Sequence, residues 1–135
     1  LIVATVSGLL QLVTGHQSAN GVAINQPAKL AAFEGHYDSM KVADMYLFGY
    51  VNQKDKTVSG VKIPGGLSFL LHNNFTTPVK GLNAFPVADR PKQVNAIFQV
   101  YHIMIAVGMT IIGLTLFAMF LWWRGKLFKY KWLRI

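Results

Sequence analysis

The segment over residues 103–123 constrains the fold most, because it contains no charged residue and only two threonines as polar interruptions. Roughly 20 apolar residues, rising 1.5 Å each, are enough to cross the hydrocarbon core of a bilayer. Apolar residues lie on every side of this stretch, unlike the single apolar stripe of a soluble surface helix. Trp122 and Trp123 followed by Arg124 are typical of a membrane interface. The sequence therefore predicts a transmembrane helix over residues 96–124.

Composition and charge agree with a membrane protein. Hydrophobic residues make up 53% of the chain, which is high for an ordinary soluble domain. Residues 124–135 contain five basic residues and no acidic one. By the positive-inside rule, residues 125–135 are expected in the cytoplasm and residues 15–95 on the external side. Basic and aromatic residues also alternate in nucleic-acid-binding segments, but directly after a span they fit the anionic inner leaflet better, so no nucleic-acid partner is expected.

The start of the chain predicts part of a second helix. Residues 1–14 are mostly apolar, but about thirteen apolar residues are too few for a complete span. We interpret them as the C-terminal part of a transmembrane helix in an excerpt of a longer protein, with Gly15 as the expected helix end. The chain has no cysteine, which excludes disulfides, thiolate nucleophiles and cysteine-based metal sites within it.

The long segment over residues 15–95 is expected to leave the membrane. Asn20 and Gly21 suggest a turn, and His16 is a lone loop histidine that is more often solvated than functional. Residues 45–51 and 58–63 are β-prone and flank polar turn residues, which predicts a small hairpin. Residues 73–95 contain three prolines and predict an irregular connection. A loop this long between spans is usually functional.

A short helix of about two turns is predicted, with Pro27 at its first position, helix-forming residues over 28–34 and Gly35 as its stop. Lys29 and Glu34 are five residues apart, or about 140° around a helix, so they do not form the favoured i,i+4 ion pair. Either the two charges are solvated on a surface helix, or each faces a different partner.

Tyr101, His102 and Met104 lie near the start of the predicted span and carry side chains with cofactor chemistry. His102 and Met104 are two residues apart, about 200° around a helix, so at most one of them can ligate a given iron. A methionine thioether is a soft iron ligand that raises the potential of a haem. Buried methionine is more often simply packing, so spacing alone leaves both interpretations of Met104 open.

Several motifs resemble subunit I of the cytochrome bd quinol oxidases, the bacterial terminal oxidases that oxidise quinol and reduce oxygen to water. These motifs are GHQSA, QPAKLAAFEG, LFGYVN, KIPGG, PVKGL and YHIMIAVGM, and together they cover nearly the whole chain. QPAKLAAFEG is the most specific of them. The resemblance implies a mainly α, multi-span helix bundle of the bacterial cytoplasmic membrane. Within it, this chain would hold the end of the sixth span, the external quinol-binding loop of the short type, and the seventh span.

The resemblance also implies roles for individual residues. Met104 would be an axial ligand of haem b558, and Lys29 and Glu34 would bind or oxidise quinol. His102 stands where many members have arginine, and a contact with a haem propionate is one role open to it. Haem b595, haem d and a second oxidase subunit would belong to the full complex, so this excerpt alone is not expected to be active.

A hypothesis from another class is a non-enzymatic membrane-anchored module whose external loop binds a partner protein. A membrane-active basic peptide would explain only the C-terminal residues. The oxidase hypothesis is favoured because an anchored loop has no reason to combine QPAKLAAFEG with YHIM.

Overall fold

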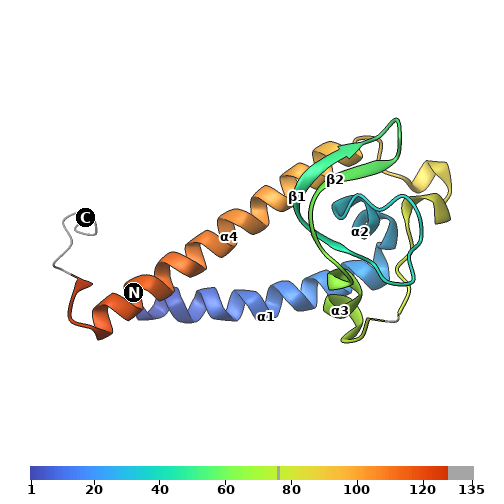
Figure 1. Cartoon of the computed structure of the whole chain (residues 1–135). Coiled ribbons are helices and arrows are strands. Elements are labelled where there is room, and N and C mark those ends of the chain that lie inside the picture. The colour runs from blue at the N-terminus through green and yellow to red at the C-terminus, as the bar shows by residue number, and fades with distance from the viewer. Residues whose placement is uncertain (76, 128–135) are drawn as a thin grey trace. The chain divides into compact units, whose positions relative to one another are not determined.

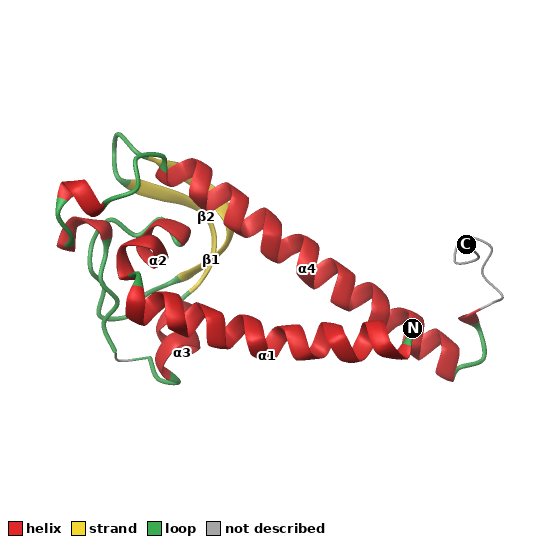
Figure 2. Ribbon diagram, turned by 180° about the vertical axis from the view of Figure 1, so that it is seen from behind, coloured by secondary structure: helices red, strands yellow, loops and turns green. Residues whose placement is uncertain are grey.

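The computed structural model describes residues 1–75 and 77–127, and it is mainly helical with one small sheet (Figure 1). The described residues divide into two units. Leu1–His16 and residues 105–127 form one, and Gln17–Met104 forms the other. The elements in chain order are α1 (Ile2–Asn25), α2 (Pro27–Phe33), β1 (Met45–Asn52), β2 (Thr57–Ile63), α3 (Gly66–His72), the 3-10 turns η1 (Leu82–Ala84) and η2 (Val87–Asp89), and α4 (Val94–Trp123) (Figure 2).

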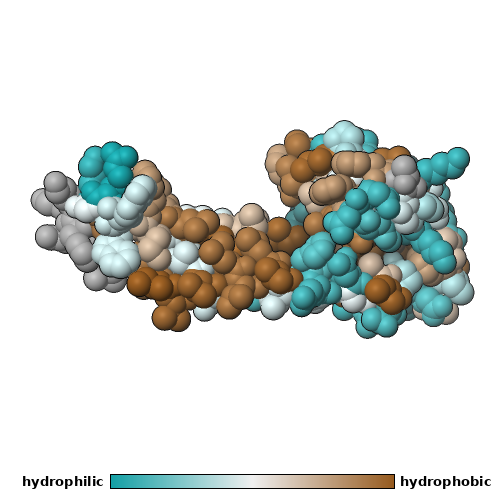
Figure 3. Space-filling view, turned by 90° about the horizontal axis from the view of Figure 1, so that it is seen from below, coloured by the Kyte–Doolittle hydropathy of each residue, from teal (hydrophilic) through white to brown (hydrophobic). Residues whose placement is uncertain are grey.

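The predicted membrane helix is present as α4. Among the described residues, one candidate span is found, within Val87–Trp123, and only 6% of its most apolar window is buried. Hydrophobic side chains cover this part of the surface (Figure 3). A Cβ added at Gly8 of α1 would lie 3.3 Å from Ile112 of α4. The glycine therefore permits the close approach of two helices that small residues provide in membrane proteins.

The predicted end of the first helix at Gly15 is wrong. Helix α1 continues to Asn25, through Gly15, His16 and the expected turn at Gly21. A glycine within a helix costs only about 1 kcal/mol relative to alanine, so it does not have to end the helix. The effective stop is Pro27, because the residue before a proline is pushed out of the helical region. Gln26 accordingly has φ −138° and ψ 59°.

The short helix and the hairpin are confirmed. Helix α2 begins with Pro27 at its first turn and ends before Gly35, which has φ +69°. Strands β1 and β2 pair antiparallel, with a register irregularity between Tyr46 and Phe48. One core of this unit joins α2, the hairpin and the first turns of α4, and its buried members are Ala31, Ala32, Val51, Leu82, Val94 and Phe98.

A second short helix follows the hairpin. Residues 66–72 form helix α3, which was not predicted from the sequence. Its Leu67 packs in a second core with Leu30, Ala43 and Val79. The sequence FKYKWLRI after Gly125 also predicts the start of another helix, and its residues 128–135 lie outside the described residues. The division into domains at residues 14, 95 and 124 stays a prediction.

Candidate functional site

Lys29 lies on the exposed side of α2, at an open and largely apolar pocket of about 570 Å³. The pocket is bounded by Asn25, Gln26, Pro27, Ala28, Lys29, Phe85, Asp89, Pro91 and Ile97. Clefts that bind small molecules are mostly apolar with a few polar groups that fix orientation. The pocket therefore offers an apolar wall and one ammonium group to a ring-shaped ligand.

Glu34 lies at the other end of α2 and does not line this pocket. Its exposed fraction is 3%, although carboxylates are rarely buried without a cation. Burial raises the pKa of Glu34 to about 7, while a hydrogen bond from the backbone N–H of Tyr46 opposes the rise. Its Oε2 atom has no hydrogen-bond partner within the described part of the chain. Glu34 is therefore a carboxyl whose proton can be gained or lost near neutral pH.

The aromatic ring of Phe33 links Lys29 to Tyr101 of α4. The Lys29 ammonium is 5.7 Å from the centroid of the Phe33 ring. The Phe33 and Tyr101 rings stack with their centroids 4.4 Å apart and nearly parallel. Tyr101 is also within electrostatic range of Glu34. The sequence alone does not identify Phe33 as a site residue, because its position in a short apolar run does not indicate that its ring stacks on Tyr101.

His102 is only 8% exposed, and both of its ring nitrogens face backbone carbonyls. Nδ1 lies 2.8 Å from the Phe98 oxygen, one turn earlier in α4, and Nε2 lies 2.9 Å from the Tyr46 oxygen of β1. A neutral imidazole has one N–H and can donate to only one of them, whereas the imidazolium donates to both. A contact with a haem propionate stays a prediction, and it would have to replace one of these two hydrogen bonds.

Met104 lies on α4 and is 62% exposed. At Gly108, one helical turn later, no described residue apart from its chain neighbours and the backbone of α4 itself comes within 4 Å of the position that a Cβ would occupy. The thioether is thus accessible in the described part of the chain. A thioether with this exposure fits a residue that would bind a haem iron.

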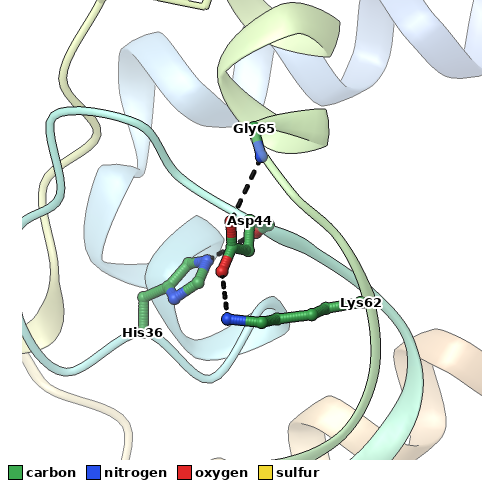
Figure 4. Close-up of polar contacts among 4 residues, drawn as sticks. All are labelled: His36, Asp44, Lys62 and Gly65. Atoms are coloured by element: carbon green, nitrogen blue, oxygen red, sulfur yellow. Dashed lines mark hydrogen bonds and ion pairs between the residues drawn. The ribbon is translucent and has the colours of Figure 1, made fainter.

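A polar junction near α3 was not predicted from the sequence (Figure 4). The Asp44 carboxylate accepts hydrogen bonds from the Lys62 ammonium and from the Gly65 backbone, while its carbonyl is 2.8 Å from Nε2 of His36. Burial lowers the pKa of His36 and favours its neutral form. The junction fixes the ends of the hairpin against α2 and α3. Scattered polar residues in an irregular stretch gave no spacing signal for it.

Comparison with known proteins identifies the family. The family described as "Cytochrome bd terminal oxidase subunit I" matches residues 1–135. The chain therefore belongs to the cytochrome bd terminal oxidase subunit I family, as the sequence motifs indicated.

Individual relatives agree with this assignment. The chain is 37% identical over 83% of its length to the Bacillus subtilis protein named "Putative cytochrome bd menaquinol oxidase subunit I", and it covers 26% of that relative. It is 32% identical over 98% of its length to "Cytochrome bd ubiquinol oxidase subunit 1" of Bacillus subtilis, and it covers 30% of that relative. Among solved structures, the bd oxidase of Geobacillus thermodenitrificans matches 96% of this chain with a TM-score of 0.74 and 30% identity. This chain covers 28% of that structure's chain.

Proposed function

We propose that this chain is the quinol-oxidising segment of a cytochrome bd-type terminal oxidase. The main support is Glu34. Its carboxyl is buried, one of its oxygens has no hydrogen-bond partner among the described residues, and its pKa is raised to about 7. Quinol oxidation releases protons as well as electrons, so its site needs a base that can accept a proton near neutral pH. The names of both curated relatives, which refer to menaquinol and ubiquinol, support a quinol substrate.

Lys29 binds the quinol head group in this proposal. The pocket beside it has an apolar wall for the ring, and the ammonium can stabilise an oxygen on which negative charge develops. Glu34 accepts the proton at the other end of α2. Lys29 lies over the Phe33 ring, Phe33 stacks on Tyr101, and Tyr101 is within electrostatic range of Glu34, so a quinol lying along this aromatic pair would approach both groups.

Met104 would bind the iron of a low-spin haem, haem b558. When bound, that haem supplies the acceptor for the electrons leaving quinol. Haem b595 and haem d, where oxygen is reduced, are held elsewhere in the full subunit, which works with a second subunit in the bacterial cytoplasmic membrane. Residues 15–95 lie on the external face and residues 125–135 in the cytoplasm, as the charge distribution indicates.

The direct test is quinol oxidase activity of the full-length enzyme with Glu34→Gln or Lys29→Met. Both variants are expected to lose activity at least tenfold while haem content stays near the parental value. Lys80→Met is a matched control, because Lys80 is an exposed lysine of the same unit that does not line the pocket. Parental rates and affinities in both Glu34→Gln and Lys29→Met would refute the proposal.

A further inference from the structure

The pocket beside Lys29 is lined by two parts of the chain that are far apart in sequence. Lys29 and its neighbours around the start of α2 line one part, and Phe85, Asp89 and Pro91 line another. These last three residues lie within or beside the short 3-10 turns η1 and η2. Such a stretch has no long helix or strand pairing to fix its shape, so its remaining hydrogen bonds decide where the pocket residues lie.

The guanidinium of Arg90 bridges this stretch from within. Its Nε donates to the Phe85 carbonyl at 2.8 Å, and its Nη2 donates to the Asn83 carbonyl at 3.2 Å. A longer bond of 3.4 Å joins Nη1 to Oδ1 of the Asn83 side chain. The rigid fork of a guanidinium holds several acceptors in one fixed geometry. Arg90 therefore fixes the backbone at Asn83 and at Phe85, a residue of the pocket.

Asn83 ties the bridged stretch to the rest of its unit. Its N–H donates to the Tyr37 carbonyl at 2.8 Å, and its Nδ2 donates to Oδ1 of Asp38 at 2.8 Å. Leu82, the residue before it, is buried in the core that also contains two alanines of α2. The stretch that Arg90 bridges is thus anchored to the same core as the helix on the other part of the pocket.

We propose that Arg90 is a positioning residue for quinol binding, which holds the Phe85 backbone so that this residue keeps its place in the pocket. This role rests on the proposed function, in which the quinol head group binds beside Lys29. Arg90 is not among the residues that line the pocket, so it acts through Phe85 rather than on the quinol. An apolar wall contacts the bound ring equally before and during oxidation, so its loss weakens binding rather than the chemical step.

The test is steady-state kinetics of the full-length oxidase with quinol, in Arg90→Met and in its control Lys92→Met. Arg90→Met removes the bonds to Phe85 and Asn83, so the quinol KM should rise by on the order of tenfold while kcat stays within about twofold. Lys92→Met removes the same charge from an exposed residue that does not line the pocket, and both constants should stay parental. A parental KM in Arg90→Met, or an equal rise in Lys92→Met, would overturn the proposal.

A double substitution shows whether Arg90 acts through Phe85. Phe85→Ala should itself raise the quinol KM, and adding Arg90→Met should raise it by less than about twofold more, because no ring is left to position. Effects that multiply would contradict the proposed route.

Arg90→Lys separates positioning from charge, and it replaces Arg90→Met if that variant does not assemble. Lysine keeps the charge, but its single ammonium does not reproduce the fork, so the quinol KM should still rise. A parental KM in Arg90→Lys would assign the role to charge alone and overturn the proposal.

Amide hydrogen exchange distinguishes a failure of this inference from a failure of the proposed quinol site. Exchange across residues 82–90 should be faster in Arg90→Met than in the parent or in Lys92→Met, since loss of the bridge loosens this stretch. Unchanged exchange would refute the bridge. Faster exchange together with parental kinetics in Lys29→Met would refute quinol binding at this pocket, and the role of Arg90 in it, while the bridge itself would stand.

Discussion

At the scale of single residues, two carboxyl groups of the Gln17–Met104 unit, Glu34 and Asp44, show how the surroundings of a side chain decide its chemistry. Burial raises the pKa of Glu34 to about 7, since only one backbone N–H opposes it. Burial also acts to raise the pKa of Asp44, but the Lys62 ammonium and the Gly65 N–H outweigh it and lower that pKa overall. Asp44 is therefore a permanently charged structural group, whereas Glu34 can exchange a proton.

The first prediction is a pH dependence of quinol oxidation. A proton acceptor must be ionised before it can act, so the rate should be low below the pKa of Glu34, about 7, and rise above it. Oxygen consumption with a fixed quinol concentration, measured from acidic to alkaline pH, gives this profile. The residual activity of Glu34→Gln should not show the same rise. A flat parental profile through neutral pH would contradict the role of Glu34.

The second prediction concerns Met104. Replacement by leucine conserves the volume but removes the thioether, so it should abolish or shift the low-spin haem band and cost less than about 1.5 kcal/mol of stability. The measurement is the reduced-minus-oxidised visible spectrum of the full-length protein. Met109→Leu is the matched control, because Met109 is a similarly exposed methionine of the same helix. An unchanged band in Met104→Leu would remove this residue from the haem site.

At the scale of elements, local sequence signals predicted α2 and the hairpin correctly, but they predicted the wrong end for α1. Pro27 and Gly35 mark the ends of α2 through backbone geometry, which sequence shows directly. Glycine ends many helices, so Gly15 predicts a helix stop, yet here the helix continues to Asn25. The burial of Glu34 and the contacts of Tyr46 depend on segments that meet only in the fold. No spacing rule could have predicted them.

The third prediction tests the packing of the hairpin on α2. A Cβ at Gly35 would lie 2.8 Å from Val58 and 2.9 Å from Val51, and its φ of +69° is unfavourable for alanine. Gly35→Ala should therefore destabilise this contact by about 1–3 kcal/mol. Faster hydrogen exchange across residues 45–63 and lower quinol oxidation are expected. Gly21→Ala, at a helical position with no atom within 4 Å of the added Cβ, should leave the exchange unchanged.

At the scale of the whole molecule, this chain covers 26–30% of the length of the curated relatives that it matches. Many apolar side chains of α1 and α4 are exposed in it, including Leu10, Val107 and Phe117. Lipid and the remaining spans of a complete oxidase are the natural environment for such surfaces.

The fourth prediction is the orientation of the chain in the membrane. In a cysteine-free background of the full-length protein, cysteines are introduced at Ser59 and Lys126, which are both exposed. An impermeant thiol reagent applied to intact cells should label position 59 and leave position 126 unlabelled until the membrane is opened, since the basic residues after the span are expected inside. Labelling of position 126 with protection of position 59 would invert the orientation.

The central claim, that quinol is oxidised at Lys29 and Glu34, is tested most directly by rapid-mixing reduction of the haem in the absence of oxygen. Quinol is mixed with the full-length Glu34→Gln enzyme, and the low-spin haem band is followed over time. The predicted result is reduction by quinol at least tenfold slower than in the parent, with an unchanged rate for dithionite, which needs no proton acceptor. Reduction by quinol at the parental rate would contradict the account.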